Sequence, residues 1–283
     1  MASFIQKVFN LDRRIIFLFI FLSVLVPLMV KFNLPIKAGR NVQIVYDKIE
    51  TVAAKNGTIL VSFDFDTASK PELEPMARAV IAHAMMRNVK VVAMGNWPNG
   101  VELAKDTMRS LAKEYNKVEG TDWAYLGYKP GAAIVIINMG RDIKSAFPTD
   151  YRTVKTSDMP ITKDIKTLKD FDYVISFAAG SGGIEEWVIY GSTKFGFDLG
   201  GGCTAVMAPD FFPFLQSGQL KGIIGGLAGA AQYEALINKP AFGFSGMRPQ
   251  SVAHIVLIFF ILFGNVCYLM DKFYFQKRKD GAQ

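Results

Sequence analysis

The chain has 283 residues, of which 51% are hydrophobic, 13% aromatic and 20% charged. This composition excludes a disordered protein and suffices for one sizeable core, or for one domain with membrane segments. The formal net charge is +7, and three short segments hold all of the excess: residues 1–14 carry +2, residues 31–40 carry +3 and residues 271–283 carry +2. Because this excess flanks two apolar runs, it indicates a membrane protein and no nucleic-acid partner.

The first apolar run covers residues 15–30 and contains no formal charge. The sequence FNLP extends its apolar character, so we expect a transmembrane helix over residues 15–34, preceded by a cytoplasmic N-terminus of residues 1–14. No small-residue cleavage site follows the run, which favours an uncleaved anchor over a signal peptide.

The second apolar run covers residues 251–270 and is also uncharged. Its length matches a membrane crossing. The tail of residues 271–283 holds four Lys and Arg side chains, whereas residues 236–250 hold two. The excess of basic residues therefore predicts a cytoplasmic C-terminus. Two crossings then place the N-terminus in the cytoplasm as well and make residues 38–248 a single extracytoplasmic domain.

The two cysteines predict no disulfide, since Cys203 lies in the domain and Cys267 in the second apolar run. An extracytoplasmic domain without a disulfide is more typical of a bacterial envelope than of a eukaryotic secreted protein. We therefore expect a two-pass protein of a bacterial inner membrane.

Apolar runs alternate with helical patterns along the domain. We expect strands at 58–65, 89–97, 132–140, 173–180 and 203–208, and helices at 40–56, 71–88, 101–116 and within 182–196. Residues 141–171 are less regular. The alternation predicts a Rossmann-like, three-layer α/β domain with a mostly parallel sheet of about five strands.

Asp64 and Asp66 form the sharpest chemical signal, because two carboxylates directly after a buried strand could hold Mg²⁺ or act as nucleophile and general acid. The string Asp64-Phe65-Asp66-Thr67 resembles the first motif of haloacid-dehalogenase-type phosphatases, an Asp-x-Asp-x-Thr signature. It departs from that motif because the threonine comes one position early. The alternative is that Asp66, Thr67 or Ser69 caps the following helix.

A second set of candidates lies in the loops that should converge at the carboxyl ends of the strands. The candidate ligand-binding residues are Trp97, Arg141, Gly180, Ser181, Gly182 and Gly183. The glycines could cradle an anion, but they lack the dinucleotide fingerprint and the P-loop pattern, and a tight turn is the simpler interpretation. With two histidines in the chain, we expect no metal site, no cofactor and no Ser-His-Asp triad.

A third set suggests contacts with other molecules. Its members are Phe211, Phe212, Phe214, Gly222, Gly226, Ala230 and Asn265. The aromatic cluster and the small-residue spacing fit either a core helix or a contact with another subunit or the bilayer surface. Asn265, polar within an apolar run, could bond to a partner helix.

Three functional classes follow from these patterns. The favoured one is a non-enzymatic accessory or scaffold subunit that contacts an integral membrane protein, a second copy of the chain, or both. The alternatives are an extracytoplasmic solute-binding or sensory domain, and a Mg²⁺-dependent phosphohydrolase centred on Asp64 and Asp66.

Overall fold

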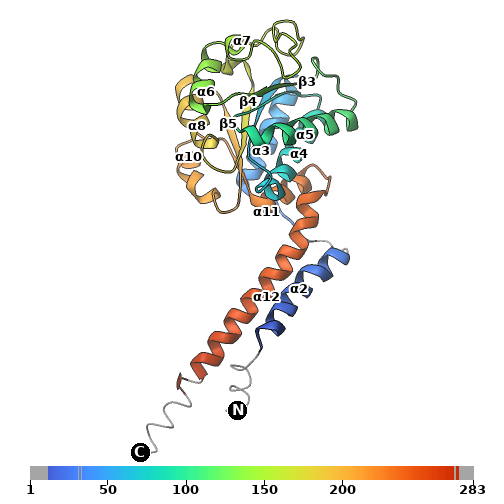
Figure 1. The fold of residues 1–283 in the computed structure, drawn as a ribbon, viewed down its shortest axis with the longest axis vertical. Helices are drawn as coiled ribbons and strands as arrows, with labels where there is room; N and C mark the ends of the chain where they lie inside the picture. Colours follow the sequence, from blue (N-terminus) through green and yellow to red (C-terminus); the bar gives the residue numbers. More distant parts are fainter. Residues whose placement is uncertain (1–11, 31, 33, 271, 274–283) are drawn as a thin grey trace, which may run out of the picture. The chain divides into compact units, whose positions relative to one another are not determined.

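A computed structural model describes residues 12–30, 32, 34–270 and 272–273. The chain divides into two compact units, Ile36–Phe244 and Met1–Pro35 with Ser245–Gln283 (Figure 1). The expected N-terminal and C-terminal cytoplasmic segments lie largely outside the described residues.

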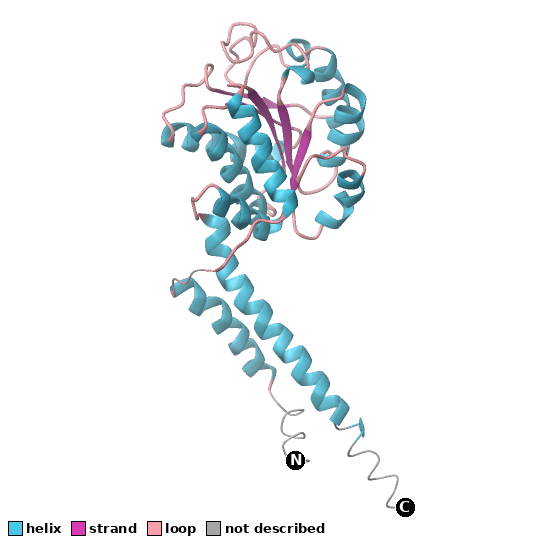
Figure 2. Cartoon of the chain, turned by 180° about the vertical axis from the view of Figure 1, so that it is seen from behind, coloured by secondary structure: helices cyan, strands magenta, loops and turns pink. Residues whose placement is uncertain are grey.

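The unit Ile36–Phe244 is built on a sheet of six parallel strands (Figure 2). The strands are β1 (Thr58–Asp64), β2 (Lys90–Gly95), β3 (Trp123–Tyr128), β4 (Tyr173–Ala178), β5 (Leu199–Cys203) and β6 (Ile223–Gly225). Their order is β3-β2-β1-β4-β5-β6. The chain therefore reverses its direction of travel between β1 and β4, as in doubly wound nucleotide-binding folds, and the carboxyl ends of these two strands form the switch point.

Helices cover both faces of the sheet (Figure 1). One face packs against α3 (Arg40–Ala54), α4 (Lys70–Met86), α5 (Val101–Glu114) and α11 (Gly226–Leu236). The other packs against α6 (Ala132–Arg141), α7 (Ile143–Ala146), η2 (Leu168–Asp170), α8 (Ile184–Glu186), η3 (Trp187–Ser192), α9 (Thr193–Phe195), η4 (Ala208–Phe211) and α10 (Phe212–Gln216). A further short helix, η1 (Pro98–Gly100), precedes α5.

Strand periodicity explains why the domain has two cores. Ile59, Val61 and Phe63 of β1 enter one buried cluster, whereas Leu60 enters the other. Successive strand side chains point to opposite faces, so continuous apolar runs are what a sheet covered on both sides requires. The expected three-layer α/β architecture with a mostly parallel sheet is confirmed.

Two of the expected strands are wrong in position. Residues 132–140 form helix α6, and the third strand is β3, which was not predicted. A short continuous apolar run fits a buried helix as well as a strand. Gly131, whose φ of 85° is left-handed, lets the chain turn into this helix. The expected strand 203–208 is also displaced, because pairing with β4 ends at Cys203.

The sixth strand, β6, lies where the small-residue stretch suggested a continuous helix. The sheet therefore has six strands and not about five. The glycines of this region allow β6 to pair beside Gly201 and Gly202 before α11 begins at Gly226.

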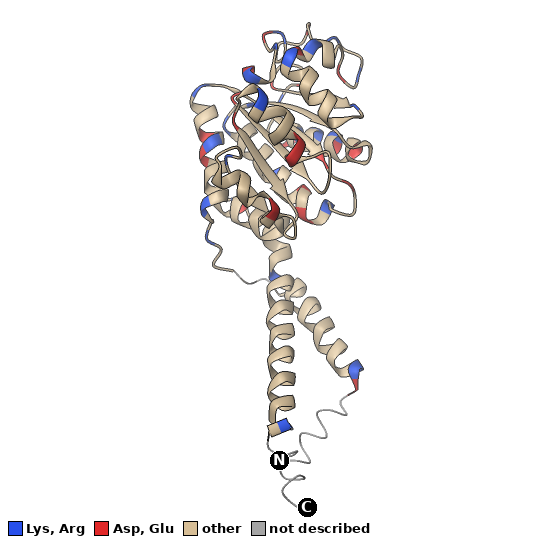
Figure 3. Ribbon diagram, turned by 90° about the vertical axis from the view of Figure 1, so that its left-hand side faces the viewer, with Lys and Arg blue, Asp and Glu red and all other residues tan. Residues whose placement is uncertain are grey.

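The other unit contains α2 (Arg13–Met29) and most of α12 (Phe242–Met270), whose Phe19 and Phe260 rings meet edge to face at 5.9 Å. Among the described residues, α12 is the one helix long and apolar enough to cross a membrane. Few charged residues lie along it, in contrast to the α/β domain (Figure 3). The helix in the first apolar run ends at Met29, short of the expected 15–34.

Candidate functional site

Asp64 lies at the carboxyl end of β1, at the switch point, and its side chain is fully buried. One carboxylate oxygen accepts hydrogen bonds from the Ser62 hydroxyl and the Asn96 backbone N–H, both at 2.8 Å. The other accepts from the Ser176 hydroxyl at 2.8 Å and the Trp187 indole N–H at 3.2 Å. The carboxylate therefore joins β1, the end of β2, β4 and η3 through four donors.

Burial raises the pKa of Asp64 from 3.8 to about 6, and its four hydrogen bonds offset part of this effect. A carboxyl group that titrates near pH 6 could serve as a general acid or base. However, both oxygens are already occupied by protein donors, which suits a group that holds strands together.

Asp66 has a separate role in the turn before α4. One of its oxygens accepts from the backbone N–H groups of Ala68 and Ser69 at 3.1 and 3.2 Å. These bonds close the turn ahead of α4 and do not reach the amides of the helix itself. Ser69 occupies the N-cap position without a side-chain capping bond, so the expected capping of this helix by Asp66, Thr67 or Ser69 is not seen. The two carboxylates thus have different partners, and the described residues contain no group of three or more His, Cys, Asp or Glu placed to hold a metal.

The glycine loop after β4 is covered by Trp97. The Trp97 indole N–H donates to the Ser181 carbonyl at 2.9 Å. Gly180 and Gly182 both have positive φ, and a Cβ on either would lie 3.3 Å from the indole. Glycine is therefore needed so that the ring can pack on the backbone. At Gly183, a Cβ would overlap Ala178.

Arg141 does not join these residues. The loop lies beside the start of α6, since a Cβ on Gly182 would contact Ala132. Exposed Arg141 is the last residue of the same helix. Nine residues of α-helix span about 14 Å. Trp97 therefore packs on the 180–183 loop, but Arg141 lies at the far end of α6 and does not complete the expected pocket.

Asn96 is a buried polar residue that was not among the predicted site residues. Its side chain is 7% exposed, and neither its amide oxygen nor its amide nitrogen has a hydrogen-bond partner in the described structure. Its position one residue after β2, in a loop that contains Asn and Gly, was the available signal.

Among the residues that we predicted to contact other molecules, those within 211–230 lie partly in the interior of the domain and partly on its surface. Phe211 is buried, Phe214 is partly buried and Phe212 is 45% exposed. Gly222 precedes β6 and packs against α3, where a Cβ would lie 2.9 Å from the Asn41 carbonyl oxygen. These positions correct the expectation that the small residues line one helix.

Gly226 and Ala230 are also buried within the domain. Gly226 packs against Ala205, and Ala230 packs against Gly243. The small-residue spacing therefore serves close packing inside the α/β unit, as in the core-helix interpretation. Asn265, in contrast, is exposed on α12 in the described structure.

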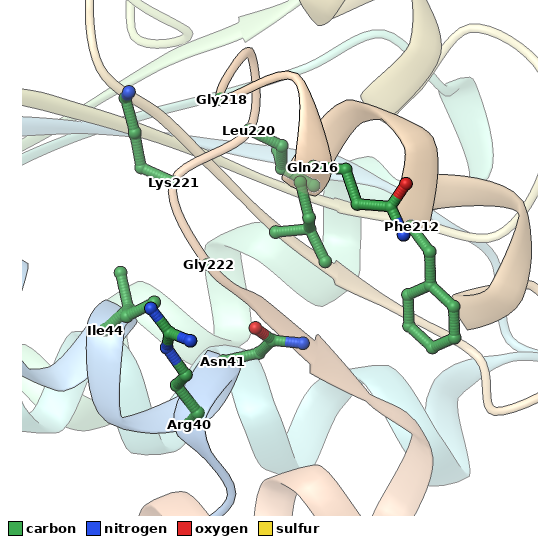
Figure 4. Close-up of a pocket in the computed structure, with 10 residues that line it drawn as sticks. Arg40, Asn41, Ile44, Phe212, Gln216, Gly218, Leu220, Lys221 and Gly222 are labelled. Carbon is green, nitrogen blue, oxygen red and sulfur yellow. The ribbon is translucent and has the colours of Figure 1, made fainter.

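A groove of about 600 Å³ opens between α3 and the segment from α10 to β6 (Figure 4). Arg40, Asn41, Ile44, Phe212, Leu215, Gln216, Gly218, Leu220, Lys221 and Gly222 line it. Arg40 and Asn41 lie on one side and Phe212 and Gln216 on the other, with Leu220 between them, while the Lys221 ammonium group points away from Arg40 (Figure 4). Of the residues predicted to form sites, Phe212 and Gly222 contribute.

A buried polar cluster centres on His83 in α4. Its Nε2 lies 2.7 Å from Glu50 Oε1 and its Nδ1 lies 2.9 Å from the Tyr233 hydroxyl. The Tyr46 ring stacks on the imidazole, with centroids 4.5 Å apart. Burial lowers the pKa of His83, and a neutral imidazole that donates to Glu50 and accepts from Tyr233 satisfies every partner. This cluster ties α3, α4 and α11 together.

No family model, curated protein or solved structure matches the chain.

Proposed function

We propose that the chain is a non-enzymatic accessory or scaffold subunit of a bacterial membrane protein assembly. In this proposal α12 and α2 anchor it in the inner membrane, the α/β domain lies outside the cytoplasm, and both termini are cytoplasmic. The excess of Lys and Arg after α12 supports this orientation.

The observation that carries the proposal is the surface of α12. Between Arg248 and Asp271 the chain has 22 uncharged residues, which as a helix span about 33 Å and match a bilayer core of about 30 Å. Exposed Ile255, Ile258, Ile261 and Leu262 suit lipid or another helix. α2 is shorter, with 17 residues, and its contact through Phe19 and Phe260 supports its assignment as the second anchor.

Asn265 supports the assembly part of the proposal. Its side chain is exposed within this apolar surface. A polar amide in a bilayer usually faces protein, where it can donate and accept hydrogen bonds. We propose that Asn265 contacts a helix of another subunit, either an integral membrane partner or a second copy.

The test is the native mass and composition of the complex after gentle extraction from its own membrane. We expect an assembly larger than the 31.3-kDa monomer. Asn265→Leu should weaken the assembly, whereas the matched variant Val266→Leu, at an exposed apolar neighbour, should leave it intact. A monodisperse monomer, or equal behaviour of the two variants, would contradict the proposal.

A further inference from the structure

The groove between α3 and α10–β6 combines an apolar floor with basic charge. Ile44, Phe212, Leu215 and Leu220 supply the apolar lining. Arg40 and Lys221 are the charged residues of the lining, and neither takes part in a salt bridge among the described residues. We propose that this groove binds one anionic phospholipid of the membrane that anchors the chain.

The charge of the lining selects the headgroup. The lining has two basic side chains and no acidic one, so it complements an anion. Arg40 is exposed and lines the groove on the side opposite Phe212 (Figure 4), and a guanidinium group matches the geometry of a phosphate with two parallel hydrogen bonds. Exposed Lys37, three residues earlier, adds to the positive charge at this end of the domain.

The apolar lining selects an acyl chain next to that phosphate. The groove volume of about 600 Å³ lies in the range of small-molecule sites, of about 300–1,000 Å³. A volume of this size accommodates a headgroup and the first part of one acyl chain. Phe212 is 45% exposed, which leaves its ring available for this contact.

The domain that contains the groove is covalently linked to the proposed membrane anchor. This linkage favours a lipid of the same membrane, and not another amphiphile, as the occupant of the groove. Arg40 follows Val30, the residue at the end of α2, by ten residues. Ten extended residues span at most about 35 Å, which is an upper bound on the distance between Arg40 and the end of α2. The inference rests on the membrane anchor of the proposed function, but it requires neither a partner subunit nor a particular orientation.

A dye at the rim of the groove tests the proposal on the full chain in an uncharged detergent. The native thiols of Cys203 and Cys267 are buried, so Gln216→Cys provides a single accessible site for an environment-sensitive fluorophore. We expect phosphatidylglycerol in mixed micelles to shift the emission to the blue at concentrations where phosphatidylcholine does not.

Variants then assign the signal to the groove. Arg40→Gln should raise the half-saturating concentration of phosphatidylglycerol about tenfold, the loss expected for one charged hydrogen-bonding group. Phe212→Ser should raise it in the same direction. Arg141→Gln and Ile134→Ser, at an exposed basic and an exposed apolar position on α6, should leave it unchanged.

Three outcomes would overturn the inference: equal response to the two lipids, no effect of Arg40→Gln, or the same blue shift with inorganic phosphate alone. Because the measurement is made on detergent-solubilised chain, it is independent of the native mass. A monomer with a functional groove would contradict only the accessory-subunit proposal, and an assembly with an unresponsive groove would contradict only the lipid site.

Discussion

At Asp64, burial and hydrogen bonding act in opposite directions on one carboxyl group. Burial dominates and raises the pKa in the folded chain to about 6, above its ordinary value of 3.8. Between these two pH values the folded chain binds more protons than the unfolded chain. The contribution of Asp64 to the free energy of unfolding is therefore largest below about pH 4 and falls as the pH rises towards 6.

Asp64→Asn removes this titration and provides the reference for measuring it. A shift of about two pKa units corresponds to about 3 kcal/mol. We therefore expect the stability advantage of the wild-type chain over Asp64→Asn to shrink by most of that amount between pH 4 and pH 7. Denaturant unfolding of both chains in detergent at several pH values measures it. Asp66→Asn is the control, and a pH-independent difference for Asp64→Asn would contradict the interpretation.

Asp64 and Asp66 also show what the sequence could indicate about the site. Their position after a buried strand was predictable from the apolar run, whereas the expected capping of α4 by Asp66 was wrong, because Asp66 bonds amides of the turn before the helix. The donors to Asp64 were not, because Ser176 and Trp187 come from residues more than 100 positions away. Only the sheet order, with β4 beside β1, brings them together.

Among the elements, β5 is the strand least expected from its sequence. Gly200, Gly201 and Gly202 occupy its centre, although glycine weakens strands. Large side chains from neighbouring elements fill the space: a Cβ on Gly202 would overlap the Phe177 ring and lie 2.7 Å from Met76 Sδ. The local sequence pattern does not predict this strand, because the side chains that require glycine here belong to β4 and α4, which are distant in the sequence.

Gly202→Ala should consequently destabilise the domain. Adding a methyl group to a filled core costs about 1–3 kcal/mol. Thermal or denaturant unfolding of the full chain measures the loss. Gly264→Ala is the matched control, because nothing lies within 4 Å of a Cβ there and alanine favours a helix. Equal stability of Gly202→Ala and the wild-type chain would show that β5 adjusts to admit the side chain.

The start of α12 depends on a buried carboxylate in α11. Glu234 accepts hydrogen bonds from the backbone N–H groups of Ala241, Gly243 and Phe244, each at 2.8 Å. Burial raises the pKa of Glu234, and these three bonds offset part of the effect. The first N–H groups of a helix lack partners within the helix and attract negative charge, so Glu234 stabilises the point where α12 begins.

Glu234→Ala should loosen this first turn. We expect faster hydrogen exchange at the amides of Ala241–Phe244, by about tenfold or more, since losing a charged acceptor costs about 1.5–3 kcal/mol. Exchange measured by mass spectrometry on the full chain tests this. Glu114→Ala, at a half-exposed carboxylate, is the control. Unchanged exchange in Glu234→Ala would mean that other contacts hold the turn.

At the scale of the whole chain, hydropathy and charge predicted the two apolar helices, whereas their lengths came from the structure. The first apolar run becomes a helix that ends at Met29, and the second becomes part of a 29-residue helix that begins within the α/β unit at Phe242. The sequence pattern alone could not place that start, because Glu234 and Gly243, which define it, carry no apolar signal.

The proposed orientation predicts where single cysteines can be labelled. Asn99 is exposed in η1, and the native cysteines are buried, so background labelling should be low. In spheroplasts of a bacterial host, a membrane-impermeant maleimide should modify Asn99→Cys directly. It should modify Gln283→Cys only after the membrane is permeabilised, because basic residues favour the cytoplasmic side. The reverse pattern would place the domain in the cytoplasm. Labelling of both positions in intact spheroplasts would mean that α12, which lies between them, does not cross the membrane.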